Sequence, residues 1–161
     1  MNRRTRFMSI ALLSLVACAF PQASFAQSDP FIGTWQLNLA KSKFSPGPGP
    51  KAQTAKIEAD GQSQKVSVTG VNAQGNPINN AFTTNFDGMP HPTSNPNPNF
   101  DASANARIDA HTLVFSRTKG GKLVGTQTVT VSSDGKMLTA TTVLIGANGQ
   151  PTNNIAVFDK Q

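Results

Sequence analysis

Residues 31–39, FIGTWQLNL, have the pattern of a β-strand, because their large apolar residues alternate with small or polar ones. Phe31, Trp35, Leu37 and Leu39 therefore fall on one face of an extended strand. Runs rich in threonine and valine repeat this period along the chain, and no segment after residue 27 has a sustained helical period. The sequence therefore predicts an all-β protein.

Turn residues separate these runs at short intervals. Asp-Gly and Gly-Gly pairs supply the positive φ that tight hairpins need, so neighbouring strands should pair antiparallel in sequence order. We expect an up-and-down meander of about eight to ten strands, closed into a barrel, with a two-sheet sandwich as the alternative. The expected strands lie at roughly 32–39, 53–59, 63–71, 78–86, 104–109, 112–118, 122–132, 137–146 and 153–159.

An internal repeat relates two parts of the chain. Residues 53–80 align without a gap on residues 127–154, with nine of 28 positions identical and most of these in turns. Both copies should therefore build the same three-stranded unit. Duplication explains the repeat, and so does convergence of similar hairpins on similar turn residues.

Two proline-rich segments interrupt the strand pattern. Ser45–Pro50 alternates proline with glycine, which predicts an irregular connection. Met89–Asn99 holds four prolines among asparagine and serine, which predicts a long exposed loop.

The first 26 residues have the three zones of a secretory signal. Arg3, Arg4 and Arg6 precede the uncharged apolar run 7–20, and Ser24-Phe25-Ala26 has the small-residue pattern of a cleavage site. We therefore expect an exported protein, periplasmic or extracellular, in which residues 27–161 form a single domain. A run of 14 apolar residues is shorter than the roughly 20 that a membrane-spanning helix needs.

A second processing site remains open. Leu15-Val16-Ala17-Cys18 resembles the lipobox of bacterial lipoproteins, and lipidation of Cys18 would anchor the protein to a membrane. Cys18 is also the only cysteine, so residues 27–161 hold no disulfide and no thiol nucleophile. We weigh cleavage after Ala26 above lipidation, because the segment after Cys18 stays apolar.

Composition argues against several function classes. Without the three leader arginines the formal net charge falls from +6 to +3, and the remaining lysines are scattered, so we expect no nucleic-acid partner. His91 and His111 lack nearby ligands at metal-binding spacing, so we expect no metal and no cofactor. No nucleophile elbow, phosphate loop or dinucleotide fingerprint is present. We therefore expect a monomer that is not an enzyme.

The start and end of the chain resemble the calycin barrels. Gly33-Thr34-Trp35 matches the Gly-x-Trp strand that opens lipocalins and fatty-acid-binding proteins, and the end Ala156–Lys160 is similar to the closing strand of the latter. The layout also resembles small exported bacterial lipocalin-like proteins of unassigned function. The resemblance implies a lipocalin-like barrel, with Gly33 and Trp35 in structural roles.

The resemblance to the fatty-acid-binding proteins does not imply that this protein binds fatty acids. In the fatty-acid-binding family an arginine and a tyrosine on the last strand hold the ligand carboxylate, whereas Ala156 and Phe158 stand at those positions here. The proline-glycine connection at Ser45–Pro50 also cannot form that family's two-helix lid.

Two functional hypotheses follow. In the first, the barrel binds a small apolar molecule in a mouth lined by some of Phe82, Phe86, Phe100 and Phe115. In the second, the barrel is solid, and the loop 89–99 contacts another component of the cell envelope. Trp35 should pack in the core, with Arg107 or Arg117 as candidates to cover its ring.

Overall fold

The computed structural model describes residues 29–94, 97–146 and 149–161, which form ten strands and one short 3-10 helix. The proposed signal, with Cys18 and Ala26, lies outside the described residues. The elements are β1 (Gly33–Leu37), η1 (Leu39–Lys41), β2 (Ala52–Asp60), β3 (Ser63–Val71), β4 (Pro77–Thr84), β5 (Pro90–Pro92), β6 (Ala102–Asp109), β7 (Thr112–Lys119), β8 (Lys122–Val131), β9 (Met137–Ile145) and β10 (Pro151–Lys160).

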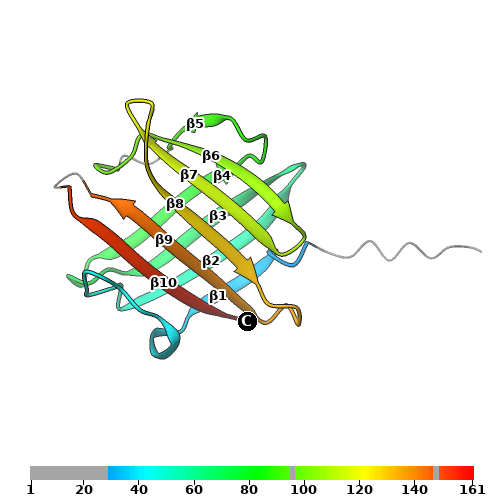
Figure 1. Ribbon diagram of the computed structural model, residues 1–161. Coiled ribbons are helices and arrows are strands. Elements are labelled where there is room, and N and C mark those ends of the chain that lie inside the picture. The colour runs from blue at the N-terminus through cyan, green and yellow to red at the C-terminus, as the bar shows by residue number, and fades with distance from the viewer. Residues whose placement is uncertain (1–28, 95–96, 147–148) are drawn as a thin grey trace, which may run out of the picture.

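All ten strands belong to one antiparallel sheet in the order β4-β3-β2-β1-β10-β9-β8-β7-β6-β5. The sheet curls so that β6 to β10 cross in front of β2 to β4 (Figure 1). The predicted all-β meander is therefore confirmed, and a single sheet excludes the sandwich. The expected closure is incomplete, because no strand ladder joins β4 to β5 within the described residues. These two edge strands leave a seam in the barrel.

Each of the nine expected strands is present, with ends that differ by a few residues. The tenth strand, β5, lies inside the segment that the sequence predicts to be a loop. Pro90 pairs with Ala104 and Pro92 with Ala102. Prolines are tolerated in this strand because it is an edge strand, with a neighbour on one side only.

The two repeat copies form the three-stranded units β2-β3-β4 and β8-β9-β10. Their second turns share one hydrogen-bond pattern: Asn72 N donates to Asn76 O in the first copy, and Gly146 N to Gln150 O in the second. Their Asp-Gly turns differ, since two residues separate β2 from β3 whereas five separate β8 from β9. The repeat therefore holds for the strands and for one turn of each unit.

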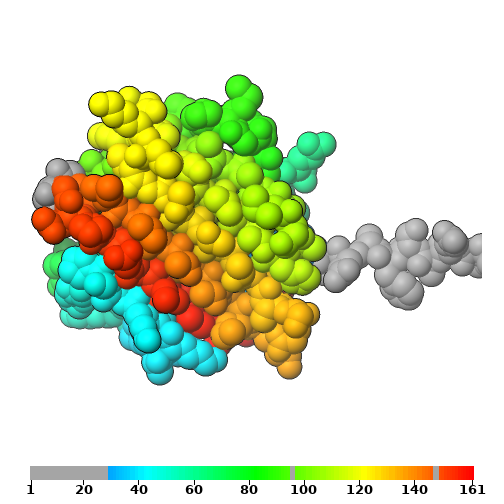
Figure 2. All heavy atoms as spheres, in the orientation of Figure 1, coloured from blue at the N-terminus to red at the C-terminus, as the bar shows by residue number. Residues whose placement is uncertain are grey.

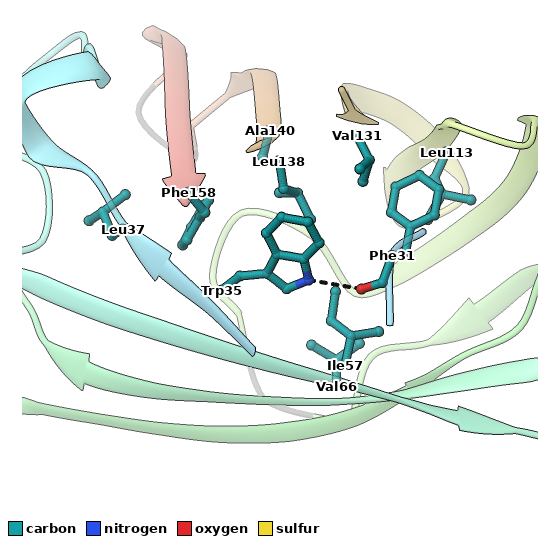
Figure 3. Packing of buried hydrophobic residues seen from close by; sticks show 10 residues of the cluster. All are labelled: Phe31, Trp35, Leu37, Ile57, Val66, Leu113, Val131, Leu138, Ala140 and Phe158. Atoms are coloured by element: carbon teal, nitrogen blue, oxygen red, sulfur yellow. Dashed lines mark hydrogen bonds between the residues drawn. The ribbon is translucent and has the colours of Figure 1, made fainter. Parts of the chain in front are cut away.

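Trp35 packs in the hydrophobic core (Figure 3), where it and Phe31 are fully buried. Its indole Nε1 donates to the Phe31 carbonyl over 2.8 Å. The cation above the ring is Lys160, with Nζ 4.9 Å from the ring centre, and neither candidate arginine takes this place. Gly33 makes room for the lysine, because a Cβ at this residue would lie 2.8 Å from Lys160 Cε.

Arg107 covers the neighbouring rings at the same end of the barrel. Its guanidinium lies 5.2 Å from the centre of the Phe31 ring and 5.3 Å from that of Phe86. Asp29 pairs with this guanidinium over 2.6 Å and also accepts from Gln64 Nε2 over 2.9 Å. This end of the interior is therefore closed by apolar packing and one neutralised arginine.

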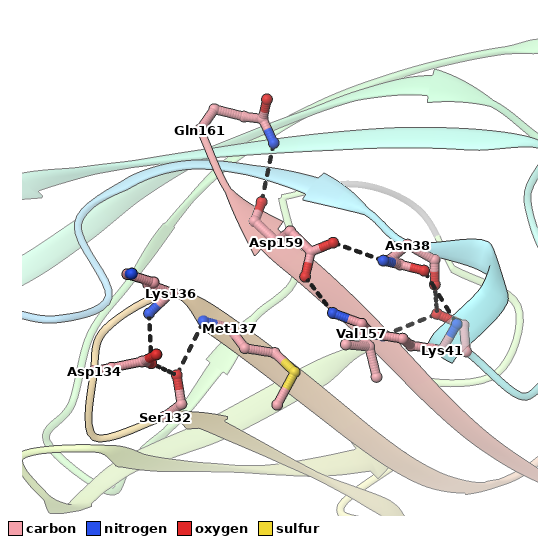
Figure 4. A network of polar contacts seen from close by, with 10 residues as sticks. Asn38, Lys41, Ser132, Asp134, Lys136, Met137, Val157, Asp159 and Gln161 are labelled. Atoms are coloured by element: carbon pink, nitrogen blue, oxygen red, sulfur yellow. Dashed lines mark hydrogen bonds and ion pairs between the residues drawn. The ribbon is translucent and has the colours of Figure 1, made fainter.

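The segment between β1 and β2 is fastened to the last strand. Asp159 accepts hydrogen bonds from Asn38 Nδ2 over 2.6 Å and from Lys41 Nζ over 3.0 Å (Figure 4). Lys43 also pairs with Ile155, so the segment lies alongside β10, cyan against red in Figure 2. The proline-glycine part of this segment forms no strand or helix, as predicted.

Candidate ligand-binding pocket

The interior of the barrel changes character away from Trp35. On β6 the side chains of Ser103 and Asn105 are buried and hydrogen-bonded to each other. Arg117 on β7 donates to Gln127 on β8, and Gln127 in turn donates to Thr142 on β9. One part of the interior is therefore an apolar core, and another is lined by two sets of hydrogen-bonded polar side chains, which together come from four strands.

A pocket of about 250 Å³ opens at this polar part, along the seam between β4 and β5. Asn80, Phe82 and Thr83 of β4 form one wall. Ser103 and Asn105 of β6, together with Arg117, line the interior side. The remaining wall comes from the segment after β4, through His91, Pro92, Thr93, Ser94, Asn97 and Phe100.

The seam is bridged at one end of the pocket. Gly88 N donates to the Asn105 carbonyl over 3.0 Å, and Asn105 Nδ2 donates to the Asn85 carbonyl over 3.2 Å. Beyond Asn105 no ladder continues across the seam in the described part of the chain. The pocket therefore occupies the stretch where the sheet leaves its interior accessible between two edge strands.

Arg117 is held in place by stacking and by small neighbours. Its guanidinium carbon lies 4.8 Å from the ring centre of Phe100 and 5.3 Å from that of Phe115. The residues opposite it in the sheet are Ser103 on β6 and Gly125 on β8, neither of which fills the space. The register of β7 and β8 shifts between Arg117 and Thr118, an irregularity of the kind that re-aims side chains near sites.

No acidic side chain in the described part of the chain forms an ion pair with Arg117. Burial lowers the pKa of Arg117 to about 10, so it remains a cation at neutral pH. Its single side-chain hydrogen bond goes to the neutral oxygen Gln127 Oε1, over 3.0 Å, and it takes part in none of the four ion pairs among the described residues. None of the described residues that line the pocket is an aspartate or a glutamate.

The free N–H groups of Arg117 reach the pocket. No fully buried side-chain nitrogen or oxygen of the described residues lacks a hydrogen-bond partner. The guanidinium nitrogens without a protein acceptor must therefore be accessible, and Arg117 lines the pocket. The arrangement presents a pre-oriented cation with unused donors, which is suited to an acceptor with negative charge.

The four predicted phenylalanines divide into two pairs. Phe82 and Phe100 line the pocket. Phe86 packs under Arg107 and Phe115 under Arg117, and both contact the hydrophobic core rather than the pocket. Two of the four predicted residues therefore line the pocket, and three of the four, Phe100 included, lie under an arginine.

Sequence reasoning considered Arg117 only as a cover for Trp35, and so missed its place in the pocket. The alternation of β7 contains the signal, because Leu113, Phe115 and Arg117 share one face of the strand. A cation at the end of an inward-facing apolar series is a candidate interior residue. What the alternation does not reveal is the absence of an acid nearby.

His91 connects the pocket wall to the turn that precedes β5. Its Nε2 lies 2.8 Å from Asp87 Oδ2, and both side chains are partly exposed. The Met89 amide and His91 both hydrogen-bond to Asp87 and hold the pKa of that carboxyl below its ordinary value.

Across the described residues, no three His, Cys, Asp or Glu side chains form a group that could hold a metal ion. Among the described residues, no helix is long and apolar enough to cross a membrane.

Comparison with known proteins establishes the class of fold. No family model matches the chain, and no curated protein matches it in sequence. Among solved structures, the chain is similar to the zebrafish ileal bile acid-binding protein complexed with cholic acid, with a TM-score of 0.51 and 13% identity. The match covers 82% of this chain and 99% of that one. The protein thus has the calycin fold of the fatty-acid-binding and bile-acid-binding proteins.

Proposed function

We propose that this protein binds a small molecule with an apolar body in the seam pocket. The observation that carries the proposal is the pocket itself, which places Phe82 and Phe100 at an opening between two edge strands of a curled sheet. Apolar walls with a few oriented polar groups are the usual composition of a small-molecule site. The role is binding rather than catalysis.

The fold supports this function, because the similar zebrafish protein was crystallised with cholic acid. The pocket differs in scale from a typical drug-sized site. Its volume of about 250 Å³ lies below the roughly 300–1,000 Å³ of such sites. We therefore propose a compact ligand rather than a long flexible chain.

The segment 89–99 supports ligand binding over a role as a docking loop. His91, Pro92 and Thr93 line the pocket, and β5 pairs with β6. The segment is therefore attached to the sheet and forms part of the wall. In the alternative, the segment would contact another protein of the envelope through its exposed side chains, among them Met89 and Pro92.

Native mass spectrometry of the protein purified from its own host tests this function. The wild-type protein should retain a small molecule that organic solvent releases. Asn80→Trp should abolish retention by filling the pocket, whereas Asn79→Trp, the adjacent exposed residue on β4 outside the pocket, should not. Equal retention by both variants, or no adduct in any preparation, would contradict the proposal.

We also propose that the protein acts outside the cytoplasm, on the basis of the signal-like residues 1–26. An intact mass beginning at Gln27 supports free export, and a lipidated Cys18 supports membrane anchoring. An unprocessed chain in the cytoplasmic fraction would contradict both.

A further inference from the structure

We infer that Arg117 is an anion-recognition residue, and that the ligand of the seam pocket is a compact organic acid that carries further hydrogen-bonding groups. The inference rests on the proposed function and specifies the chemical class of the ligand. It starts from the contrast between the two arginines of the domain.

Both arginines have the same stacking environment, but only one has a counterion. Arg107 lies over Phe31 and Phe86 and pairs with Asp29 over 2.6 Å. Arg117 lies over Phe100 and Phe115 and is less exposed than Arg107, yet no carboxylate is present among the described residues that line its pocket. Buried charges in proteins are normally paired, because an unpaired one loses its hydration without compensation. An anion from outside the protein supplies the missing partner.

The geometry of the guanidinium favours a planar anion. The guanidinium carbon lies over the rings of Phe100 and Phe115, and Gln127 Oε1 accepts from Nη2 over 3.0 Å. What remains for a ligand is an N–H edge, which matches a carboxylate in a bidentate arrangement. The adjoining hollow is lined by both Lys119 and Asp101, so it adds no net charge, and Arg117 is the charged group on which the inference rests.

The other wall groups indicate a ligand with more than one polar function. Asn80, Thr83, Ser94 and Asn97 present amides and hydroxyls around the two phenylalanines. A long alkyl chain would leave these groups unpaired, whereas a ring bearing hydroxyl substituents would use them. The positions that hold the carboxylate in the fatty-acid-binding proteins are Ala156 and Phe158 here, so this anion site is on a different strand.

Isothermal titration calorimetry at pH 7 with two matched probes tests the inference. 4-Hydroxycinnamate carries the anionic group, and 4-hydroxycinnamamide is its neutral counterpart. The wild-type protein should bind the acid about 10- to 100-fold more tightly than the amide, as expected for a charge-assisted hydrogen-bonded pair. Hexadecanoate should not bind in the pocket.

Arg117→Met should abolish this preference for the acid and leave the weaker binding of the amide. Arg107→Met is the matched control, because it removes the same group from a similar stack outside the pocket, and it should keep the preference. A heteronuclear NMR spectrum of each variant confirms the fold before titration.

Three results would overturn the inference. They are equal affinity of the wild-type protein for the two probes, equal loss of the preference in both variants, and no binding of the acid at millimolar concentration. Equal affinity would leave the pocket as a ligand site without anion recognition. Where neither probe binds, retention of a host molecule in native mass spectrometry still decides the proposed function separately.

Discussion

Replacing Arg117 with methionine should leave the free protein as stable as the wild type, or more stable, although it removes a largely buried side chain. The structure supplies the magnitude. Burial lowers the pKa of Arg117 from 12.5 to about 10. At about 1.4 kcal/mol for each pKa unit, keeping this guanidinium charged in the folded protein costs about 3 kcal/mol. Methionine removes that cost and retains contact with Phe100 and Phe115.

The favourable contacts that Arg117→Met removes are similar in free energy to the burial cost that it relieves. The hydrogen bond to Gln127 contributes about 1.5 kcal/mol or somewhat more, and each ring contact contributes about 0.5–1 kcal/mol. The stability of Arg117→Met should therefore stay within about 1 kcal/mol of the wild type, or exceed it. A residue that does not stabilise the folded protein, although it is largely buried, is typical of a binding site.

Arg107→Met provides the comparison. This substitution breaks the ion pair with Asp29 and two ring contacts, and it relieves no comparable burial cost, because both charged groups are about a third exposed. We expect a loss of about 2 kcal/mol. The two variants should therefore differ by about 5–10 °C in Tm.

Urea unfolding, followed by circular dichroism on ligand-free protein, measures both free energies. If Arg117→Met proves as destabilising as Arg107→Met, then Arg117 is a structural residue, and the argument for an unpaired charge that awaits an anion is wrong.

Three further predictions concern the scaffold. Trp35→Ala should lower the free energy of unfolding by about 3–5 kcal/mol, because the indole is fully buried and donates to the Phe31 carbonyl. A loss under about 1 kcal/mol in urea unfolding would contradict the placement of Trp35 in the core. Gly125→Ala should cost about 1–3 kcal/mol, because the added methyl group would meet the Val143 carbonyl and Leu144. It should also weaken ligand binding, because Gly125 is the β8 residue opposite Arg117. Unchanged Tm and affinity would contradict this prediction. Hydrogen bonds from Asn38 and Lys41 hold the pKa of Asp159 below its ordinary value of 3.8. Their contribution to stability is therefore present above pH 3.8 and is lost as the pH falls through the lower pKa of the folded protein. Asp159→Asn should reduce the fall of Tm in acid, and an unchanged dependence of Tm on pH would count against the contact.

The fold could be predicted from the sequence because its determinants are local. Alternation at residues 31–39 and Asp-Gly turns specify strands and antiparallel neighbours, and these were enough to locate nine of the ten strands. The strand β5 was missed because prolines argue against a strand, and only the sheet order reveals that Pro90 and Pro92 lie on an edge.

The candidate site was only partly predictable, because it depends on contacts between distant segments. All four phenylalanines were chosen for their apolar character. Phe82 and Phe100 line the pocket, whereas Phe86, Phe100 and Phe115 each lie under an arginine. Which arginine has a counterion depends on Asp29, far from both in sequence. The seam itself follows from the sheet's failure to close, which no local pattern encodes.

A crystal structure of the protein purified from its own host is the most direct test of anion binding in the seam pocket. It should show a compact molecule in the seam pocket, between the wall of Phe82 and that of Phe100, with an anionic group on the free edge of Arg117. A pocket that holds only water, or a ligand bound elsewhere in the barrel, would contradict the account.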